Sequence, residues 1–286
     1  MRKTAWVMVL CLTPAVAAWS ADMSDAAYTG SMATMHAHDT PAASPVAEIA
    51  PTRPVTGHAV VYATVNGKPV HGYLARPKNS KAALPGIIVI HEWWGLNDNI
   101  RHTAERLAGE GYTALAVDLY GGHAAATPEE AETLMKGVLA DTAAASDNLR
   151  QAYFYLQDAE HAPRIGVIGW CFGGGWSLET ALMLPDKLSA AVMYYGRPVD
   201  DVARLSKLKM PLLGLFGEQD RGITPARVKA FATALKQAHV KAEIHEYPGA
   251  GHAFANPSGR NYQAAAARDA WRRTVAFFKQ YLQPAA

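Results

Sequence analysis

The sequence has very little cysteine, with two such residues in a chain of 286. Cys11 lies in the first apolar run, and Cys171 lies near the middle of the chain. If the segment that holds Cys11 is removed, no disulfide can form within the chain. A lone thiol in an oxidising compartment is a liability unless it is buried or used, so Cys171 is a candidate functional residue.

The chain also lacks a strong charge of either sign. It has 27 Lys and Arg against 25 Asp and Glu, and the basic residues form no stripe. The charge distribution therefore gives no indication of a nucleic-acid partner. Half of the residues are hydrophobic and 18% are charged, which suits a globular protein with a sizeable core.

Long hydrophobic runs are absent apart from residues 4–18, which follow the basic start Met1-Arg2-Lys3. This run is too short to cross a bilayer and ends in small residues, as a secretory signal peptide does. We predict a signal peptide over residues 1–20 and a secreted, periplasmic protein. No later segment is long and apolar enough for a membrane span, so no membrane association is expected once the signal is removed.

Residues 21–54 are rich in Ala, Ser, Thr, Pro, Met and His, and they show no periodicity. This composition predicts a flexible leader that joins the signal peptide to the domain. Residues 35–39, with the sequence Met-His-Ala-His-Asp, offer three potential metal ligands. In a mobile leader such ligands are usually incidental, so we predict no metal site and no cofactor.

From residue 55 to residue 286, short apolar runs alternate with patterns of helical spacing. The first two runs flank Asn66-Gly67, a hairpin turn signal. The alternation predicts a single α/β domain, with a mainly parallel sheet covered by helices on both faces and an antiparallel hairpin at its edge. The predicted strands cover residues 59–65, 70–76, 84–90, 112–118, 165–168, 190–196, 210–217 and 242–247. One predicted helix starts near residue 98. The others cover residues 128–139, 142–159, 176–183, 224–239 and 262–282.

Cys171 lies in the pattern Gly-x-Cys-x-Gly, between the strand at 165–168 and the following helix. This is the arrangement of a nucleophile elbow, with cysteine in the place of serine. Gly169 and Gly173 lack Cβ atoms and allow strand and helix to approach around a tight turn. The N-terminus of a helix favours a thiolate, so Cys171 is predicted to be a nucleophile. The plainer interpretation is a Gly-rich turn with an inert buried cysteine.

Two further strand ends carry polar residues in a meaningful order. Asp220 follows the strand at 210–217, and His252 lies in the glycine-rich loop after the strand at 242–247. The order nucleophile, acid, histidine is that of α/β-hydrolases, whose sites lie at the carboxyl ends of the strands. We predict that His252 accepts the thiol proton and that Asp220 orients the imidazole.

An oxyanion hole needs two backbone N–H groups directed at the developing charge. Phe172 N–H follows the nucleophile directly. The second donor is expected in the loop after the strand at 84–90, and Trp93 N–H is the candidate.

Four motifs in this order resemble the dienelactone hydrolase family. They are His91-Glu92-Trp93-Trp94-Gly95, Gly169-Trp170-Cys171-Phe172-Gly173-Gly174, Gly217-Glu218-Gln219-Asp220 and Gly251-His252-Ala253-Phe254. The resemblance covers residues 55–286. It implies a catalytic triad of Cys171, Asp220 and His252, and a fourth catalytic residue, Glu92, that touches the nucleophile until substrate binding moves it.

The chain departs from the family where that family holds a substrate carboxylate with arginines. Asn256 stands just past the histidine, and residues 120–123 contain no arginine. Arg221 and Arg260 are possible replacements, but spacing does not place them. For the substrate pocket we name five residues, three of which are aromatic and indicate an apolar lining. They are Trp94, Trp170, Phe254, Asn256 and Arg221.

The sequence therefore predicts a cofactor-free α/β-hydrolase that cleaves small esters or lactones through a thioester acyl-enzyme. The expected partner is a small-molecule ester or lactone, and the expected assembly is a monomer or a small homo-oligomer. Three other interpretations stay open. They are a hydrolase with another bond preference, such as a thioesterase or a carbon–carbon bond hydrolase, a silent binding protein on the same scaffold, and a redox role for the thiol.

Overall fold

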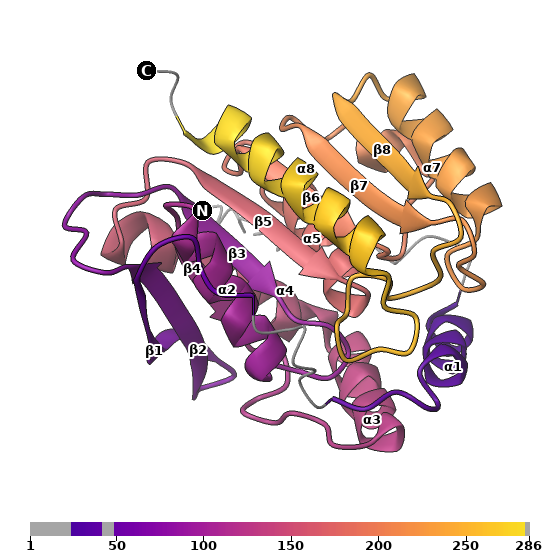
Figure 1. Cartoon of the computed structure of the whole chain (residues 1–286), viewed down its shortest axis with the longest axis horizontal. Helices are drawn as coiled ribbons and strands as arrows, with labels where there is room; N and C mark the ends of the chain where they lie inside the picture. The colour runs from indigo at the N-terminus through magenta and orange to yellow at the C-terminus, as the bar shows by residue number, and fades with distance from the viewer. Residues whose placement is uncertain (1–23, 42–48, 284–286) are drawn as a thin grey trace, which may run out of the picture.

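The computed structural model describes residues 24–41 and 49–283. Its centre is an eight-stranded sheet with the strand order β1-β2-β4-β3-β5-β6-β7-β8 (Figure 1). β2 is antiparallel to both β1 and β4, and all other neighbours are parallel. The strands are β1 (Val55–Val65), β2 (Lys68–Pro77), β3 (Gly86–Ile90), β4 (Thr113–Val117), β5 (Ile165–Trp170), β6 (Ala190–Tyr194), β7 (Leu212–Gly217) and β8 (Ala242–Tyr247). The predicted α/β-hydrolase fold is confirmed.

Helices cover both faces of this sheet. In Figure 1, α2 and α8 cross the face toward the viewer, and α5 lies behind β5 and β6. The helices are α1 (Asp25–Met35), α2 (Asp98–Gly109), α3 (Pro128–Ala140), α4 (Thr142–Phe154), α5 (Phe172–Met183), α6 (Val202–Leu205), α7 (Pro225–Gln237) and α8 (Ala264–Leu282). The helix predicted over residues 142–159 is α4 followed by a π-helical turn at Tyr155–Ala159.

Local signals in the sequence explain where several elements begin. The side chains of Asn97, Thr127 and Asp141 cap α2, α3 and α4 by accepting hydrogen bonds from backbone N–H groups of the first helical turn. The hairpin between β1 and β2 turns at Asn66 and Gly67, whose φ angles are 50° and 73°. Two consecutive left-handed residues form the turn that Asn-Gly predicts.

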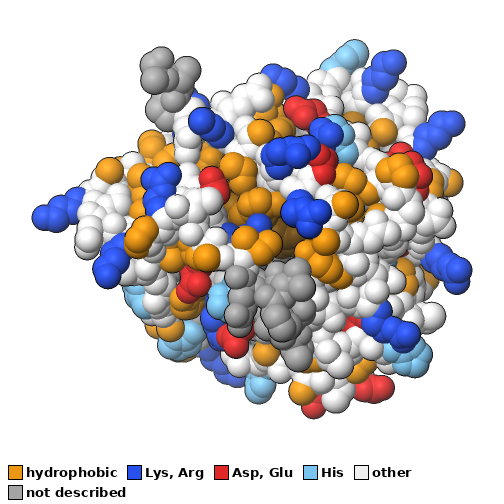
Figure 2. Space-filling model, viewed as in Figure 1, with side chains coloured by type: hydrophobic (Ala, Val, Ile, Leu, Met, Phe, Trp, Pro, Cys, Tyr) orange, Lys and Arg blue, Asp and Glu red, His pale blue; other side chains and the backbone are white. Residues whose placement is uncertain are grey.

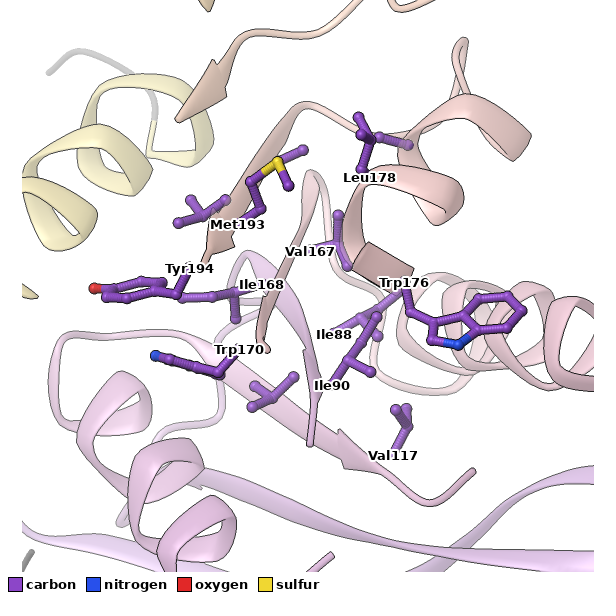
Figure 3. Packing of buried hydrophobic residues seen from close by; sticks show 14 of the residues in the cluster. Ile88, Ile90, Val117, Val167, Ile168, Trp170, Trp176, Leu178, Met193 and Tyr194 are labelled. Carbon is purple, nitrogen blue, oxygen red and sulfur yellow. The ribbon is translucent and has the colours of Figure 1, made fainter. Parts of the chain in front are cut away.

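The core lies on both sides of the parallel strands. Every residue of β3 and β5 is buried, which is why these segments read as continuous apolar runs. Figure 3 shows Ile88 and Ile90 of β3 packed among Val117, Val167 and Trp176. Burying one such side chain contributes about 1.5–3 kcal/mol, so this sheet centre is a rigid base for the loops at its edge.

The leader differs from the flexible segment expected for residues 21–54. Residues 25–35 form α1, which starts at the capping side chain of Ser24. Tyr28 and Met32, spaced by one helical turn, are buried against the domain. The predicted signal peptide over residues 1–20 lies outside the described residues. Among the residues that the structure covers, no helix combines the length and the apolar composition that a membrane span requires.

Candidate functional site

Cys171 occupies the turn between β5 and α5, with φ 53° and ψ −116°. A left-handed φ is strained for a residue with a Cβ atom, and it persists here because the neighbouring glycines fix the turn. A Cβ atom on Gly169 would lie 2.0 Å from the carbonyl oxygen of Gly173, and one on Gly173 would lie 2.3 Å from that of His91. The Gly-x-Cys-x-Gly pattern therefore forms the tight turn that its spacing predicts.

The candidate triad residues meet at the carboxyl end of the sheet. His252 Nε2 lies 3.3 Å from Cys171 Sγ, and His252 Nδ1 donates to Asp220 Oδ2 at 2.7 Å. Asp220 Oδ1 accepts from the N–H groups of Gly222 at 2.8 Å and Ile223 at 2.9 Å. These bonds fix the carboxylate, and the carboxylate in turn fixes the imidazole with Nε2 toward the sulfur.

The charges of this group favour a thiolate beside an imidazolium. Burial alone would raise the pKa of Cys171, but the charge and hydrogen bond of His252, assisted by His36, lower it to about 6. Burial opposes the charged form of His252 as well, but Asp220 and the thiolate raise its pKa well above the ordinary value. The pKa of Asp220 is lowered because the interaction with His252 outweighs its burial.

Glu92 follows β3 and is buried beside the candidate triad. Both of its carboxyl oxygens accept hydrogen bonds, Oε2 from Asn256 Nδ2 at 2.6 Å and Oε1 from Tyr195 O–H at 3.2 Å. Burial, followed by the charge of Cys171, raises the pKa of Glu92 to about 8. The resemblance implied that Glu92 touches the nucleophile. In the structure its hydrogen bonds go to Asn256 and Tyr195, and its link to Cys171 is that the charge of the thiolate raises the pKa of Glu92.

The two expected oxyanion donors occupy equivalent places on neighbouring strands. β3 and β5 pair in parallel, with Ile90 opposite Gly169. Trp93 lies three residues after Ile90, and Phe172 lies three residues after Gly169. Phe172 also begins α5, where backbone N–H groups have no partner within the helix. This placement brings both backbone segments to the same end of the sheet, near Cys171.

The leader reaches the same sulfur, which sequence reasoning missed. Met32 Sδ lies 3.4 Å and His36 Nε2 lies 3.8 Å from Cys171 Sγ. His36 Nδ1 donates to Asp39 Oδ2 at 2.8 Å, and Asp39 Oδ1 accepts from Arg260 N–H at 3.2 Å. The spacing of Tyr28, Met32 and His36 by four residues was the available signal, but small and polar neighbours obscured it.

Ion pairing and packing fix α1 in this place. Arg197, which is 3% exposed, donates to Asp25 Oδ1 at 2.8 Å, and its guanidinium lies 5.3 Å from the ring centre of Tyr28. Met35 packs closely on Gly222, where any Cβ atom would clash with it. Cys171 is consequently 0% exposed.

A cavity of about 530 Å³ lies between α2, α8 and residues 49–52, and Glu92 is one of its lining residues. In Figure 2 this face is hollowed near its centre, with hydrophobic side chains inside and Lys or Arg side chains around them. Among the predicted pocket residues, Trp170 and Asn256 line the cavity. Arg106 lies over the ring of Trp271 at its wall, 3.8 Å from the ring centre.

The other predicted pocket residues lie elsewhere. Trp94 is buried against Trp93, with ring centres 5.0 Å apart. Phe254 is buried among Tyr194, Tyr195 and Tyr247, as large aromatic side chains commonly are in a core. Arg221 is exposed. None of these three residues lines this cavity, and their assignment to the substrate pocket stays a prediction.

Comparisons with known proteins agree with this arrangement. The model of the dienelactone hydrolase family matches residues 70–282. "Protein usf" of Aquifex pyrophilus is 35% identical over 224 residues, covering 76% of this chain and 96% of that protein. A "Putative carboxymethylenebutenolidase" of Salmonella typhimurium is 36% identical over 259 residues, covering 84% and 94%.

Solved structures point the same way. A "Putative Dienelactone Hydrolase" from Klebsiella pneumoniae subsp. pneumoniae is similar with a TM-score of 0.71 and 32% identity, over 80% of this chain and all of that one. The residues that the family model matches, 70–282, include the elbow, both partner loops and strands β3 to β8. The chain therefore belongs to the dienelactone hydrolase family and is a dienelactone hydrolase-like hydrolase.

Proposed function

We propose that this hydrolase cleaves small esters or lactones with Cys171 as nucleophile, His252 as general base and acid, and Asp220 as its orienting carboxylate. The observation that carries the proposal is the continuous chain of contacts from Sγ to Nε2 at 3.3 Å and from Nδ1 to Oδ2 at 2.7 Å. A thiolate and an imidazolium already paired at rest favour nucleophilic attack without a further proton acceptor.

In the first half of the reaction, the Cys171 thiolate attacks the acyl carbon and forms a carbon–sulfur bond. The negative charge moves to the former carbonyl oxygen, where the N–H groups of Phe172 and Trp93 stabilise it. One such donor typically lowers the barrier by roughly 3 kcal/mol. The carbon–oxygen bond then breaks, and the leaving oxygen takes the proton of His252.

In the second half, His252 is neutral and accepts a proton from water as the water oxygen attacks the thioester. The carbon–sulfur bond breaks, the acid is released and the Cys171–His252 ion pair is restored. A thioester suits this step because it is a more reactive acyl group than an ester. A lactone substrate leaves as a single hydroxy acid.

Glu92 is proposed to adjust the charge beside the sulfur. With a pKa of about 8 it is mostly protonated near neutral pH and does not repel the thiolate. The carboxyl group and its partner Asn256 also line the cavity, so a bound substrate reaches them. This arrangement supports a substrate that contacts Glu92 from the cavity and whose acyl group reaches Cys171 when the leader opens. The name of the Salmonella relative supports butenolide lactones as first candidates.

The basic start of the chain and the apolar run at residues 4–18 support a secreted, periplasmic location. A monomer or small homo-oligomer remains our proposal for the assembly.

The decisive test compares wild type with Cys171→Ala in hydrolysis of a small activated ester and a butenolide. We expect at least about a 1,000-fold loss of kcat/KM for Cys171→Ala, because loss of a nucleophile removes the covalent route. Circular dichroism of both proteins checks the fold. An unchanged rate in Cys171→Ala excludes the proposal. Turnover of thioesters or carbon–carbon substrates alone supports another bond preference, and tight binding with no turnover supports a silent scaffold.

A further inference from the structure

Sulfur and nitrogen ligand atoms converge on one point at the candidate site. The sulfur atoms of Cys171 and Met32 lie 3.4 Å apart, and the Nε2 atoms of His252 and His36 lie 3.3 and 3.8 Å from Cys171 Sγ. The thiol and the two imidazole nitrogens all lie within 4.8 Å of one another, and all three residues are buried. Two of the four groups come from the leader. Hydrolysis through Cys171, His252 and Asp220 does not require them.

The two imidazoles are oriented in the same way. His252 Nδ1 donates to Asp220 at 2.7 Å, and His36 Nδ1 donates to Asp39 at 2.8 Å. Each bond fixes the proton on Nδ1 and directs the other ring nitrogen toward Cys171. A carboxylate behind each histidine is the usual outer support of a metal-binding imidazole, because it sets the tautomer and raises ligand basicity.

The spacing of the donors suits a tetrahedral ion. With metal–sulfur and metal–nitrogen bonds of about 2.3 and 2.0–2.1 Å, a tetrahedral angle separates sulfur from nitrogen by roughly 3.6 Å. The two observed sulfur–nitrogen distances, 3.3 and 3.8 Å, fall on either side of this value. These two distances fit an ion held between Cys171 Sγ and each imidazole. The two imidazole nitrogens lie within 4.8 Å of each other, and Met32 Sδ lies 3.4 Å from Cys171 Sγ.

From these contacts we infer that the leader completes a copper(I) site on the catalytic thiol, with Met32, His36, Cys171 and His252 as ligands. The thioether selects the metal. Zinc takes thiolate, imidazole and carboxylate ligands, whereas thiolate with thioether suits the softer copper(I).

Binding replaces the thiol proton with the metal. In the resting ion pair this proton is on His252, so His252 releases its Nε2 proton, the Cys171 thiolate forms a copper–sulfur bond, and His36, His252 and Met32 each supply a lone pair, so no electron is transferred. The ion then occupies the lone pairs of Cys171 and His252 that hydrolysis uses. Copper(I) occupancy and acyl transfer are mutually exclusive, which makes the bound form a metal-holding, inactive state.

The test is a competition between the metal-free chain from residue 21 onwards and the copper(I) complex of bicinchoninate, under anaerobic conditions. We expect one copper(I) per chain in wild type. His36→Ala should weaken binding by more than about 100-fold, because outer-shell changes alone cost 10–100-fold. His38→Ala is the matched control, since His38 is an exposed histidine of the same leader.

Met32→Leu and Met35→Leu form a second matched pair that tests the choice of metal. Met32→Leu should weaken copper(I) binding and leave zinc(II) binding, measured with a chromophoric zinc chelator, unchanged. Binding of copper(I) that His36→Ala does not weaken, or that His38→Ala weakens equally, overturns the site. Tighter binding of zinc(II) than of copper(I) in wild type overturns the copper assignment. Because the readout is metal affinity, the inference and the hydrolase proposal can fail separately.

Discussion

At the scale of single residues, the site controls the charge state of Cys171. Its pKa of about 6 lies well below the ordinary thiol value of about 8.5. Because the folded value is depressed, the thiolate stabilises the folded state above the unfolded pKa. That contribution is lost as pH falls through about 6.

Thiolate absorbance in the ultraviolet tests this directly and needs no reagent to reach the sulfur. With a metal chelator present, the difference between wild type and Cys171→Ala should rise with pH around a midpoint near 6. The Cys171→Ala protein supplies the baseline because it lacks the only described thiol. A midpoint near 8.5 shows that His252 and His36 do not stabilise the thiolate.

Asn256 donates a hydrogen bond to the buried carboxyl group of Glu92. Replacing Asn256 should therefore lower the free energy of unfolding. Asn256→Ala leaves Glu92 Oε2 without its donor, and an unpaired buried polar group costs about 1–3 kcal/mol. We expect urea unfolding at pH 9, where Glu92 is mostly ionised, to show this loss. Asn99→Ala, in the same cavity but bonded to Ser258, is the control and should lose less. Equal losses exclude a specific role for the Asn256–Glu92 bond.

The sequence predicted the meeting of Cys171, Asp220 and His252, because parallel strands deliver their carboxyl ends to one edge of a sheet. It did not predict that Asn256 binds Glu92 or that Phe254 is a core residue. Such details depend on which side of a loop faces the sheet. That choice is decided by packing with residues distant in the chain.

At the scale of elements, α1 is the part of the molecule that controls access to the sulfur. Tyr28→Ala removes the ring that packs against Arg197, and truncating a buried aromatic residue costs about 3–5 kcal/mol. We expect iodoacetamide to alkylate Cys171 at least about tenfold faster in Tyr28→Ala than in wild type.

Thr34→Ala is the matched control for this experiment, since Thr34 is an exposed residue of the same helix. It should react at the wild-type rate. Mass spectrometry counts the modified sulfur atoms, and circular dichroism checks that the sheet is intact. Equal rates in Tyr28→Ala and wild type contradict a cover formed by α1.

Strand periodicity predicted the sheet well, whereas α1 escaped prediction for a physical reason. β3 and β5 are buried on both faces, so their composition alone identifies them. The helix at Asp25–Met35 consists mainly of Ala, Ser, Thr, Gly and Met, and only a few of its side chains are buried. Its position depends on contacts with Cys171 and Arg197, which no local pattern contains.

At the scale of the whole molecule, our proposal that the chain is exported predicts which part of it is present in the folded protein. A Gram-negative host expressing residues 1–286 should yield periplasmic protein whose intact mass is that of a chain starting between residues 18 and 21. Intact-mass spectrometry of the periplasmic fraction measures this. The double variant Arg2→Glu, Lys3→Glu reverses the basic start and should accumulate in the cytoplasm. Full-length wild-type protein found only in the cytoplasm refutes the predicted signal peptide.

The cover that α1 forms also bears on how long the enzyme stays active. A low-pKa thiolate is the form that peroxide oxidises, and Cys171 has no second cysteine among the described residues to rescue a sulfenic acid as a disulfide. With the sulfur 0% exposed, oxidant and substrate depend on the same opening of the leader. The rate of inactivation and the rate of turnover thus depend on the same motion. A less tightly packed α1 would raise both the turnover rate and the rate at which Cys171 is oxidised.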